Sequence, residues 1–132
     1  MRSLKTILIV DDESEIRRLL KRVLGRKDYQ TVSASDGVDA MRLAREQAPD
    51  MVLLDLIMPR MGGIEVCELL RLNPSTRAIP IVMISALVET SQKIAGFNAG
   101  ADEYITKPFD LQELQARIAG TFRRCERVSR VM

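Results

Sequence analysis

The chain has 132 residues and a formal net charge of +2, with 46% hydrophobic and 29% charged residues. This length fits one domain, and the composition is that of a soluble globular protein rather than a disordered one. The small net charge gives no indication of direct nucleic-acid binding. No apolar run approaches the roughly 20 residues that cross a membrane, and the N-terminus lacks a signal-peptide pattern, so we expect a cytoplasmic protein without a membrane segment.

The absence of histidine restricts the chemistry of the chain. It excludes the usual zinc sites and catalysis by Ser-His-Asp or Cys-His groups. The two cysteines, Cys67 and Cys125, lie far apart and form no CxxC pair. Cys67 has apolar neighbours and is expected to be a buried small hydrophobe. Any reaction therefore uses carboxylates, lysine, hydroxyl groups or a metal ion.

Short, mostly apolar segments recur along the chain and have the pattern of buried strands. They cover residues 6–10, 29–34, 51–55, 79–84 and 103–106. The second segment is less apolar and is expected at an edge of the sheet. In the fourth, Pro80 stands among the first positions, where a missing N–H is tolerated.

Apolar residues at helical spacing follow each predicted strand. The first helix starts with acidic residues and ends at Gly25. The fourth is the weakest, because Gly96 lies inside it and its start is polar. The last starts at Asp110, with Glu113 three residues later, in a pattern similar to a capping box. This alternation predicts one α/β domain with a parallel sheet and helices on both faces.

Ligands of such sheets bind at the carboxyl ends of the strands. Four of the five predicted strands end there in polar or charged residues, namely Asp11 and Asp12, Asp55, Ser85 and Lys107. Carboxylates about 6 Å apart repel by roughly 3 kcal/mol per pair at an effective dielectric near 20. Lys107 and a divalent cation would offset this repulsion, and oxygen ligands favour Mg²⁺. The combination suits phosphoryl transfer with Asp55 as the nucleophile.

Each of these residues also has an ordinary structural interpretation. Asp55 could cap the end of its strand, and Asp11 and Asp12 could cap the helix that follows them. Lys107 could be a solvated lysine, and Ser85 an ordinary serine at a strand end.

Five motifs in order resemble the receiver domain of two-component response regulators over residues 4–122. They are Ile-Val-Asp-Asp-Glu at 9–13, Leu-Leu-Asp-Leu-Ile-Met-Pro-Arg-Met-Gly-Gly at 53–63, Ile-Ser-Ala at 84–86, Gly-Ala-Asp-Glu-Tyr at 100–104 and Lys-Pro-Phe at 107–109. The resemblance implies a flavodoxin-like (βα)5 three-layer sandwich with a parallel sheet of order 2-1-3-4-5. We expect residues 1–122 to form the receiver domain. Residues 123–132 are expected to be a basic extension of the last helix or the start of a linker.

The resemblance also implies how the site works. Asp55 would accept a phosphoryl group from a histidine of a partner sensor kinase or phosphotransfer protein. Asp12, Asp55 and the backbone carbonyl of Ile57 would bind Mg²⁺, and Asp11 would reach the metal through water. Lys107 would contact the phosphoryl group, and the Lys107–Pro108 peptide bond is expected to be cis.

Ser85 and Tyr104 would form the switch of such a domain. The hydroxyl group would move to the phosphoryl group and the aromatic ring would turn inward, although an aromatic residue in this strand could also be plain packing. The surface of the fourth helix, fifth strand and fifth helix would then change its partner. A homodimer through this face fits the resemblance; the downstream target or output domain stays unidentified.

Two apolar residues, Ile57 and Leu87, lie two positions beyond Asp55 and Ser85. We hypothesise that they hinder an in-line water and prolong the lifetime of the phosphoryl group. Two other functions compete with the signalling one. An Asp-nucleophile phosphohydrolase of the haloacid dehalogenase type needs a second acid where Ile57 stands. An unphosphorylated binding module would usually lack an acid or the lysine, and all are present here. We therefore expect no enzyme beyond self-phosphorylation and self-dephosphorylation.

Overall fold

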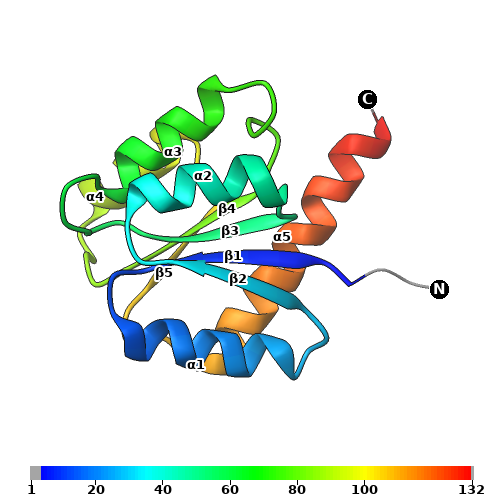
Figure 1. Cartoon of the computed structure of the whole chain (residues 1–132), viewed down its shortest axis with the longest axis horizontal. Coiled ribbons are helices and arrows are strands. Elements are labelled where there is room, and N and C mark those ends of the chain that lie inside the picture. Colours follow the sequence, from blue (N-terminus) through cyan, green and yellow to red (C-terminus); the bar gives the residue numbers. More distant parts are fainter. Residues whose placement is uncertain (1–3, 132) are drawn as a thin grey trace.

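A parallel five-stranded sheet forms the centre of the molecule, in the order β2-β1-β3-β4-β5 (Figure 1). The computed structural model describes residues 4–131, with residues 127–131 described by their backbone alone. The strands are β1 (Thr6–Val10), β2 (Gln30–Ala34), β3 (Met51–Asp55), β4 (Ile81–Ser85) and β5 (Glu103–Thr106). The helices are α1 (Ser14–Gly25), α2 (Gly37–Gln47), α3 (Gly63–Leu72), α4 (Thr90–Ala99) and α5 (Leu111–Val131). The predicted flavodoxin-like fold and strand order are confirmed.

Helices cover both faces of the sheet, with α2, α3 and α4 on one side and α1 and α5 on the other (Figure 1). Alternate residues of each strand point to opposite faces. In β1, Leu8 and Val10 belong to the apolar cluster that includes residues of α2 and α3. Ile7 and Ile9 belong to the cluster shared with α1 and α5. Burial on both faces explains why the central strands read as continuous apolar runs.

Three details of the predicted elements differ from the structure: β2 starts at Gln30 rather than at residue 29, and the other two concern β4 and the start of α5. The fourth strand was expected over 79–84, but β4 covers Ile81–Ser85. Pro80 lies just before it because it has no N–H for the ladder; its carbonyl still accepts a 2.9 Å hydrogen bond from the N–H of Val52. At α5, Asp110 accepts from the backbone of residues 112 and 113 at 2.8 and 3.0 Å, as in a cap, whereas the Glu113 carboxylate accepts from Arg117 instead.

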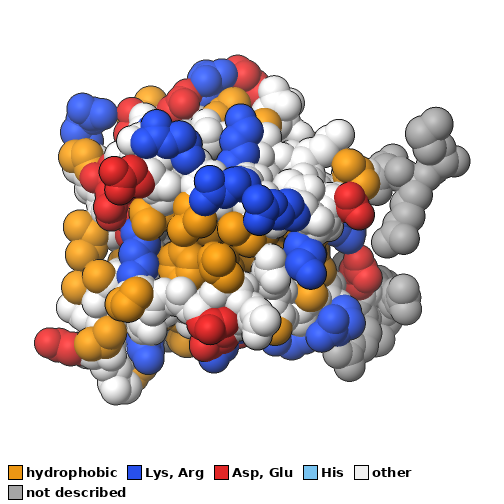
Figure 2. All heavy atoms as spheres, turned by 90° about the horizontal axis from the view of Figure 1, so that it is seen from below, with side chains coloured by type: hydrophobic (Ala, Val, Ile, Leu, Met, Phe, Trp, Pro, Cys, Tyr) orange, Lys and Arg blue, Asp and Glu red, His pale blue; other side chains and the backbone are white. Residues whose placement is uncertain are grey.

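The last helix continues through the basic segment after residue 122, as far as Val131. Lys5 holds this part of α5 through a 3.1 Å ion pair with Glu126. Figure 2 shows the face formed by α1 and α5, where hydrophobic side chains gather at the centre and Lys and Arg side chains lie around them. Within residues 4–131, no helix is both long and apolar enough to cross a membrane.

Candidate phosphoryl-acceptor site

The carboxyl ends of β1, β3, β4 and β5 meet at one edge of the sheet. Asp55 is the last residue of β3 and lies in register with Ile84 of β4, directly before Ser85. Lys107 follows β5, and its backbone N–H donates a 2.8 Å hydrogen bond to the carbonyl of Ser85. The strand order thus brings together residues that are far apart in the sequence, as predicted from the strand ends.

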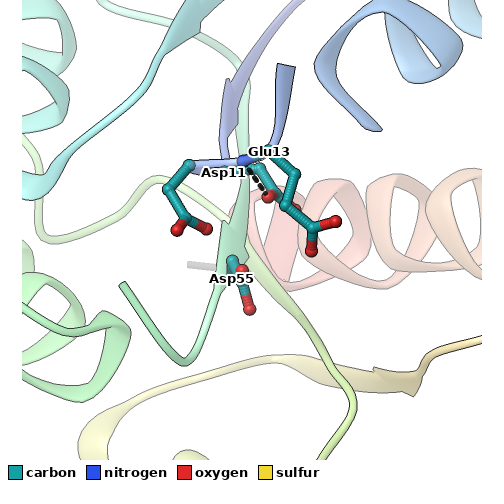
Figure 3. A group of neighbouring side chains, drawn as sticks. Asp11, Glu13 and Asp55 are labelled. Carbon is teal, nitrogen blue, oxygen red and sulfur yellow. Dashed lines mark hydrogen bonds between the residues drawn. The ribbon is translucent and has the colours of Figure 1, made fainter. Parts of the chain in front are cut away.

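Four carboxylates gather at this edge. Asp11, Asp12, Glu13 and Asp55 each offer an oxygen atom, and these oxygens lie within 4.8 Å of one another. Asp11 and Asp55 are buried, whereas Asp12 and Glu13 are exposed. Figure 3 shows Asp11 and Glu13 beside Asp55, with the backbone N–H of Glu13 donating to Asp11 Oδ1 at 2.9 Å. This acidic group is able to hold a metal ion, and an all-oxygen donor set fits a hard cation such as Mg²⁺.

Lys107 is the cation that faces the acidic group. Its Nζ lies 2.8 Å from Asp11 Oδ2, 3.5 Å from Asp55 Oδ2 and 3.6 Å from Glu13 Oε1. Burial disfavours the charged ammonium group, but the hydrogen bond and charge of Asp11 outweigh this, and the pKa of Lys107 is raised. The lysine therefore stays charged at neutral pH. The Lys107–Pro108 peptide bond is cis.

Asp55 is held in an unfavourable environment for a carboxylate. Burial and the neighbouring charge of Asp11 raise its pKa from 3.8 to about 6, although Lys107 and the N–H of Ile57 act in the opposite direction. The Asp55 side chain is 7% exposed. A group that neutralises negative charge, whether a metal cation or the lysine, would favour the ionised form. Ionised Asp55 is the form that can act as a nucleophile.

The loop after Asp55 is held close to the strand. The N–H of Ile57 donates to Asp55 Oδ1 at 3.3 Å, and the Ile57 side chain is 56% exposed. A Cβ on Gly63 would lie 2.3 Å from the backbone oxygen of Asp55, so only glycine allows α3 to start there. The N–H of Gly63 donates to the carbonyl of Leu56 at 2.8 Å. These contacts fix the backbone that carries Asp55.

Ser85 and Tyr104 are joined through one intervening residue. The N–H of Leu87 donates to Ser85 Oγ at 3.1 Å, and the carbonyl of Leu87 accepts from the Tyr104 hydroxyl at 2.8 Å. Ser85 is fully buried and Tyr104 is 7% exposed. The tyrosine ring thus already points inward in this structure.

Sequence reasoning assigned no role to Glu13 or Gly63. Glu13 was interpreted as an acidic residue at the start of a helix, yet its carboxylate lies within reach of Lys107. The position of Glu13, directly after Asp12, was the feature of the sequence that could have indicated its place in the acidic group. Gly63 appeared only as part of the motif at 53–63, because close approach between two backbones leaves no pattern in the sequence.

A carboxylate group facing a lysine at the carboxyl edge of a 2-1-3-4-5 sheet defines a receiver-type signalling domain. The chain belongs to the response regulator receiver domain family, whose family model matches residues 7–119. It is therefore a receiver domain of two-component signalling. Cys67, buried in the core, has no part in the site.

Relatives and solved structures agree with this assignment. The chain is 42% identical over 123 residues to the "Probable transcriptional regulator ycf27" of Porphyridium aerugineum, covering 93% of this chain and 50% of that protein. It is 41% identical over 122 residues to the "DNA-binding dual master transcriptional regulator RpaA" of a Synechocystis strain, covering 92% and 51%. The chain thus spans about half the length of these curated relatives.

Among solved structures, a putative response regulator from Chloroflexus aurantiacus is 36% identical, with a TM-score of 0.88 over 92% of this chain and 99% of that one. The chemotaxis protein CheY4 of Vibrio cholerae is 27% identical, with a TM-score of 0.86 over 90% and 99%.

Proposed function

We propose that this domain accepts a phosphoryl group on Asp55 from a histidine of a partner sensor kinase or phosphotransfer protein. The observation that carries this proposal is the approach of the Lys107 ammonium group to Asp55, at 3.5 Å, at the edge where the acidic group lies. A carboxylate beside a fixed cation combines a nucleophile with a counter-charge for phosphoryl oxygens. The chain contains no histidine, so the donor histidine comes from outside.

Each residue at the site has a separate role in the transfer of the phosphoryl group. Asp55 Oδ2, on the side of Lys107, forms the new bond to phosphorus while the phosphorus–nitrogen bond of the donor breaks. The N–H of Ile57 holds the other carboxylate oxygen and so orients the nucleophile. Lys107, now paired with Asp11, neutralises negative charge on the transferred group. Catalysis here is positioning and charge stabilisation rather than further covalent chemistry.

A magnesium ion fits the donor set. The carboxylates of Asp12 and Asp55 and the backbone carbonyl of Ile57 would hold it, with Asp11 acting through water. When bound, the ion would neutralise charge on the phosphoryl oxygens. The raised pKa of Asp55 supports this assignment, because a cation would relieve the repulsion from Asp11.

Ser85 and Tyr104 form the proposed switch. The Ser85 hydroxyl would turn from the N–H of Leu87 toward the phosphoryl group. Because the carbonyl of Leu87 accepts the hydrogen bond of the Tyr104 hydroxyl, a movement of Leu87 would also change the position of Tyr104. The surface of α4, β5 and α5 would transmit the change to a partner, either a target protein, a second copy of this chain or an output domain beyond the basic end of α5. DNA binding is stated by the name of the RpaA relative, which is about twice as long.

Phosphorylation with a small-molecule donor tests the proposal. The full chain is incubated with acetyl phosphate and Mg²⁺, and its intact mass is measured. We expect the mass of one phosphate to be added, and none for Asp55→Asn or when the metal is chelated. No added phosphate on the wild-type protein would refute the proposal. Continuous release of phosphate, with many turnovers per chain, would favour the phosphohydrolase instead.

A further inference from the structure

Gly96 occupies an unusual position, in the interior of α4. Glycine is the least stable residue inside a helix except proline, because its backbone loses the most freedom. A glycine inside a helix is therefore expected where close packing leaves no room for a side chain. Gly96 is also the buried residue of α4, so its missing side chain faces the rest of the protein.

The space that Gly96 leaves is shared by β4 and β5. A Cβ at this position would lie 2.9 Å from Met83 Sδ, 3.2 Å from Tyr104 Cδ2 and 3.4 Å from Tyr104 Cε2. The Met83 side chain is completely buried, so its sulfur has little room to move away. The Tyr104 ring keeps a small exposed fraction, 7%, and is therefore the group that a larger residue would displace.

The ring of Tyr104 has a defined place in this structure. Its hydroxyl donates to the Leu87 carbonyl at 2.8 Å, and Leu87 in turn donates to Ser85 Oγ. A ring displaced from Gly96 would lengthen the hydrogen bond to Leu87. The bare Cα of Gly96 thus faces Cδ2 and Cε2 of the ring, whose hydroxyl group is bonded to Leu87.

We propose that Gly96 is a positioning residue for Tyr104: the room it leaves lets the ring lie inward, bonded to Leu87, before Asp55 is phosphorylated. With alanine at position 96, the inward ring becomes dependent on the phosphoryl group. Because of Gly96, phosphorylation does not have to move the Tyr104 ring from an outward to an inward position. The link to signalling rests on the proposed function, whereas the ring position itself does not.

Fluorine NMR of the full chain labelled with 3-fluorotyrosine tests this inference. The chain has only two tyrosines. Tyr29 stacks on Phe122, with ring centroids 5.7 Å apart, and serves as an internal reference. Exposure of each ring is measured as line broadening by a soluble gadolinium chelate. Without phosphodonor, we expect a protected Tyr104 in the wild-type protein and several-fold stronger broadening in Gly96→Ala, which acetyl phosphate and Mg²⁺ should reduce.

Gly120→Ala is the matched control. It makes the same change inside α5, where a Cβ would meet no atom nearer than 3.7 Å. We expect it to leave both tyrosine signals unchanged. Equal protection of Tyr104 in the wild-type protein and Gly96→Ala, without phosphodonor, would overturn the inference.

A double-mutant cycle covers the case in which Gly96→Ala disturbs folding. If Gly96 acts through the ring, Gly96→Ala lowers the urea midpoint clearly more in the presence of Tyr104 than in a Tyr104→Ala background, where only the contact with Met83 is left. The same effect in both backgrounds would contradict the proposal. Intact mass, recorded on the same samples, shows whether the protein was phosphorylated. The comparison of wild type and Gly96→Ala without phosphodonor does not depend on phosphorylation, so a failure of the proposed function and a failure of this inference can be distinguished.

Discussion

The ammonium group of Lys107, directly after the last strand, donates a 2.8 Å hydrogen bond to Asp11, directly after the first. The lysine is thus bound more closely to Asp11 than to Asp55, which lies 3.5 Å away. Asp55 is left with incomplete compensation for burial and for the charge of Asp11, and its pKa is about 6. The site therefore favours the binding of a cation beside Asp55.

This arrangement makes Asp55 costly for the stability of the metal-free protein. Its folded-state pKa, about 6, lies above the ordinary value of 3.8, so the folded protein binds more protons than the unfolded chain between these values. The free energy of unfolding therefore falls as pH rises through this window. In EDTA at about pH 7.5, we expect Asp55→Asn to be more stable by on the order of 2 kcal/mol.

Urea titrations at neutral and acidic pH check this expectation. The gain should shrink at about pH 4, where Asp55 is largely protonated in the folded protein. Glu68→Gln, which removes an exposed carboxylate on α3, is the control and should change little. Equal stability of wild type and Asp55→Asn at neutral pH would mean that the repulsion at the site is negligible.

The two adjacent glycines at the start of α3, Gly62 and Gly63, are expected to differ sharply in how much stability is lost when each is replaced by alanine. Gly63→Ala places a Cβ 2.3 Å from the Asp55 backbone oxygen and 2.8 Å from the Cα of Leu56, and backbone atoms cannot yield cheaply. We expect a loss of about 2–4 kcal/mol and slower phosphorylation, because the nucleophile's strand must shift. In Gly62→Ala the nearest atom is the Leu56 carbonyl oxygen at 3.4 Å. That variant should stay within about 1 kcal/mol of wild type in urea, and a similar cost at both positions would argue against the close approach.

Arg71 of α3 joins three segments at the opposite end of the sheet. Its guanidinium group donates to the carbonyls of Gly100, Arg77 and Ile79 and pairs with Asp102 at 3.0 Å. We expect Arg71→Met to cost about 2–4 kcal/mol, since several carbonyl groups lose their donor. Arg71→Lys should recover little, because an ammonium group cannot span the same acceptors.

The control for Arg71 is Arg45→Met on the exposed side of α2, which should have almost no effect. Denaturation midpoints in urea report both variants. If Arg71→Met unfolds at the wild-type midpoint, then the hydrogen bonds of Arg71 contribute nothing beyond what water supplies.

Much of this architecture could be predicted from the sequence, because apolar runs identify strands that are buried on both faces. The ends of those runs placed Asp11, Asp55, Ser85 and Lys107 at one edge, where the structure has them. Arg71 was not predicted to matter: its main partner, Gly100, lies 29 positions away and is joined through backbone carbonyls, which every sequence contains. The inward position of the Tyr104 ring without a phosphoryl group also escaped prediction, because its hydrogen-bond acceptor is the backbone carbonyl of Leu87.

Leu87 bears on the lifetime of the phosphoryl group. Its backbone joins Ser85 to Tyr104, while its partly buried side chain packs on the apolar cluster below. Leu87→Gln keeps the backbone and adds a group able to orient water. We expect several-fold faster loss of phosphate, followed by intact mass after removal of acetyl phosphate. Val88→Gln, at a neighbouring position that is 63% exposed, should behave as wild type. An unchanged or slower loss in Leu87→Gln would discard the hypothesis that apolar residues here exclude water.

Chemical trapping identifies the side chain that becomes the acyl phosphate, which we propose to be Asp55. Borohydride reduces an aspartyl phosphate to homoserine, which peptide mass spectrometry assigns to one position. After treatment with acetyl phosphate and Mg²⁺, we expect homoserine at position 55 and at no other acidic residue, as phosphorylation of Asp55 requires. Homoserine at position 11 or 12 instead, or no homoserine in a protein shown to be folded, would contradict it.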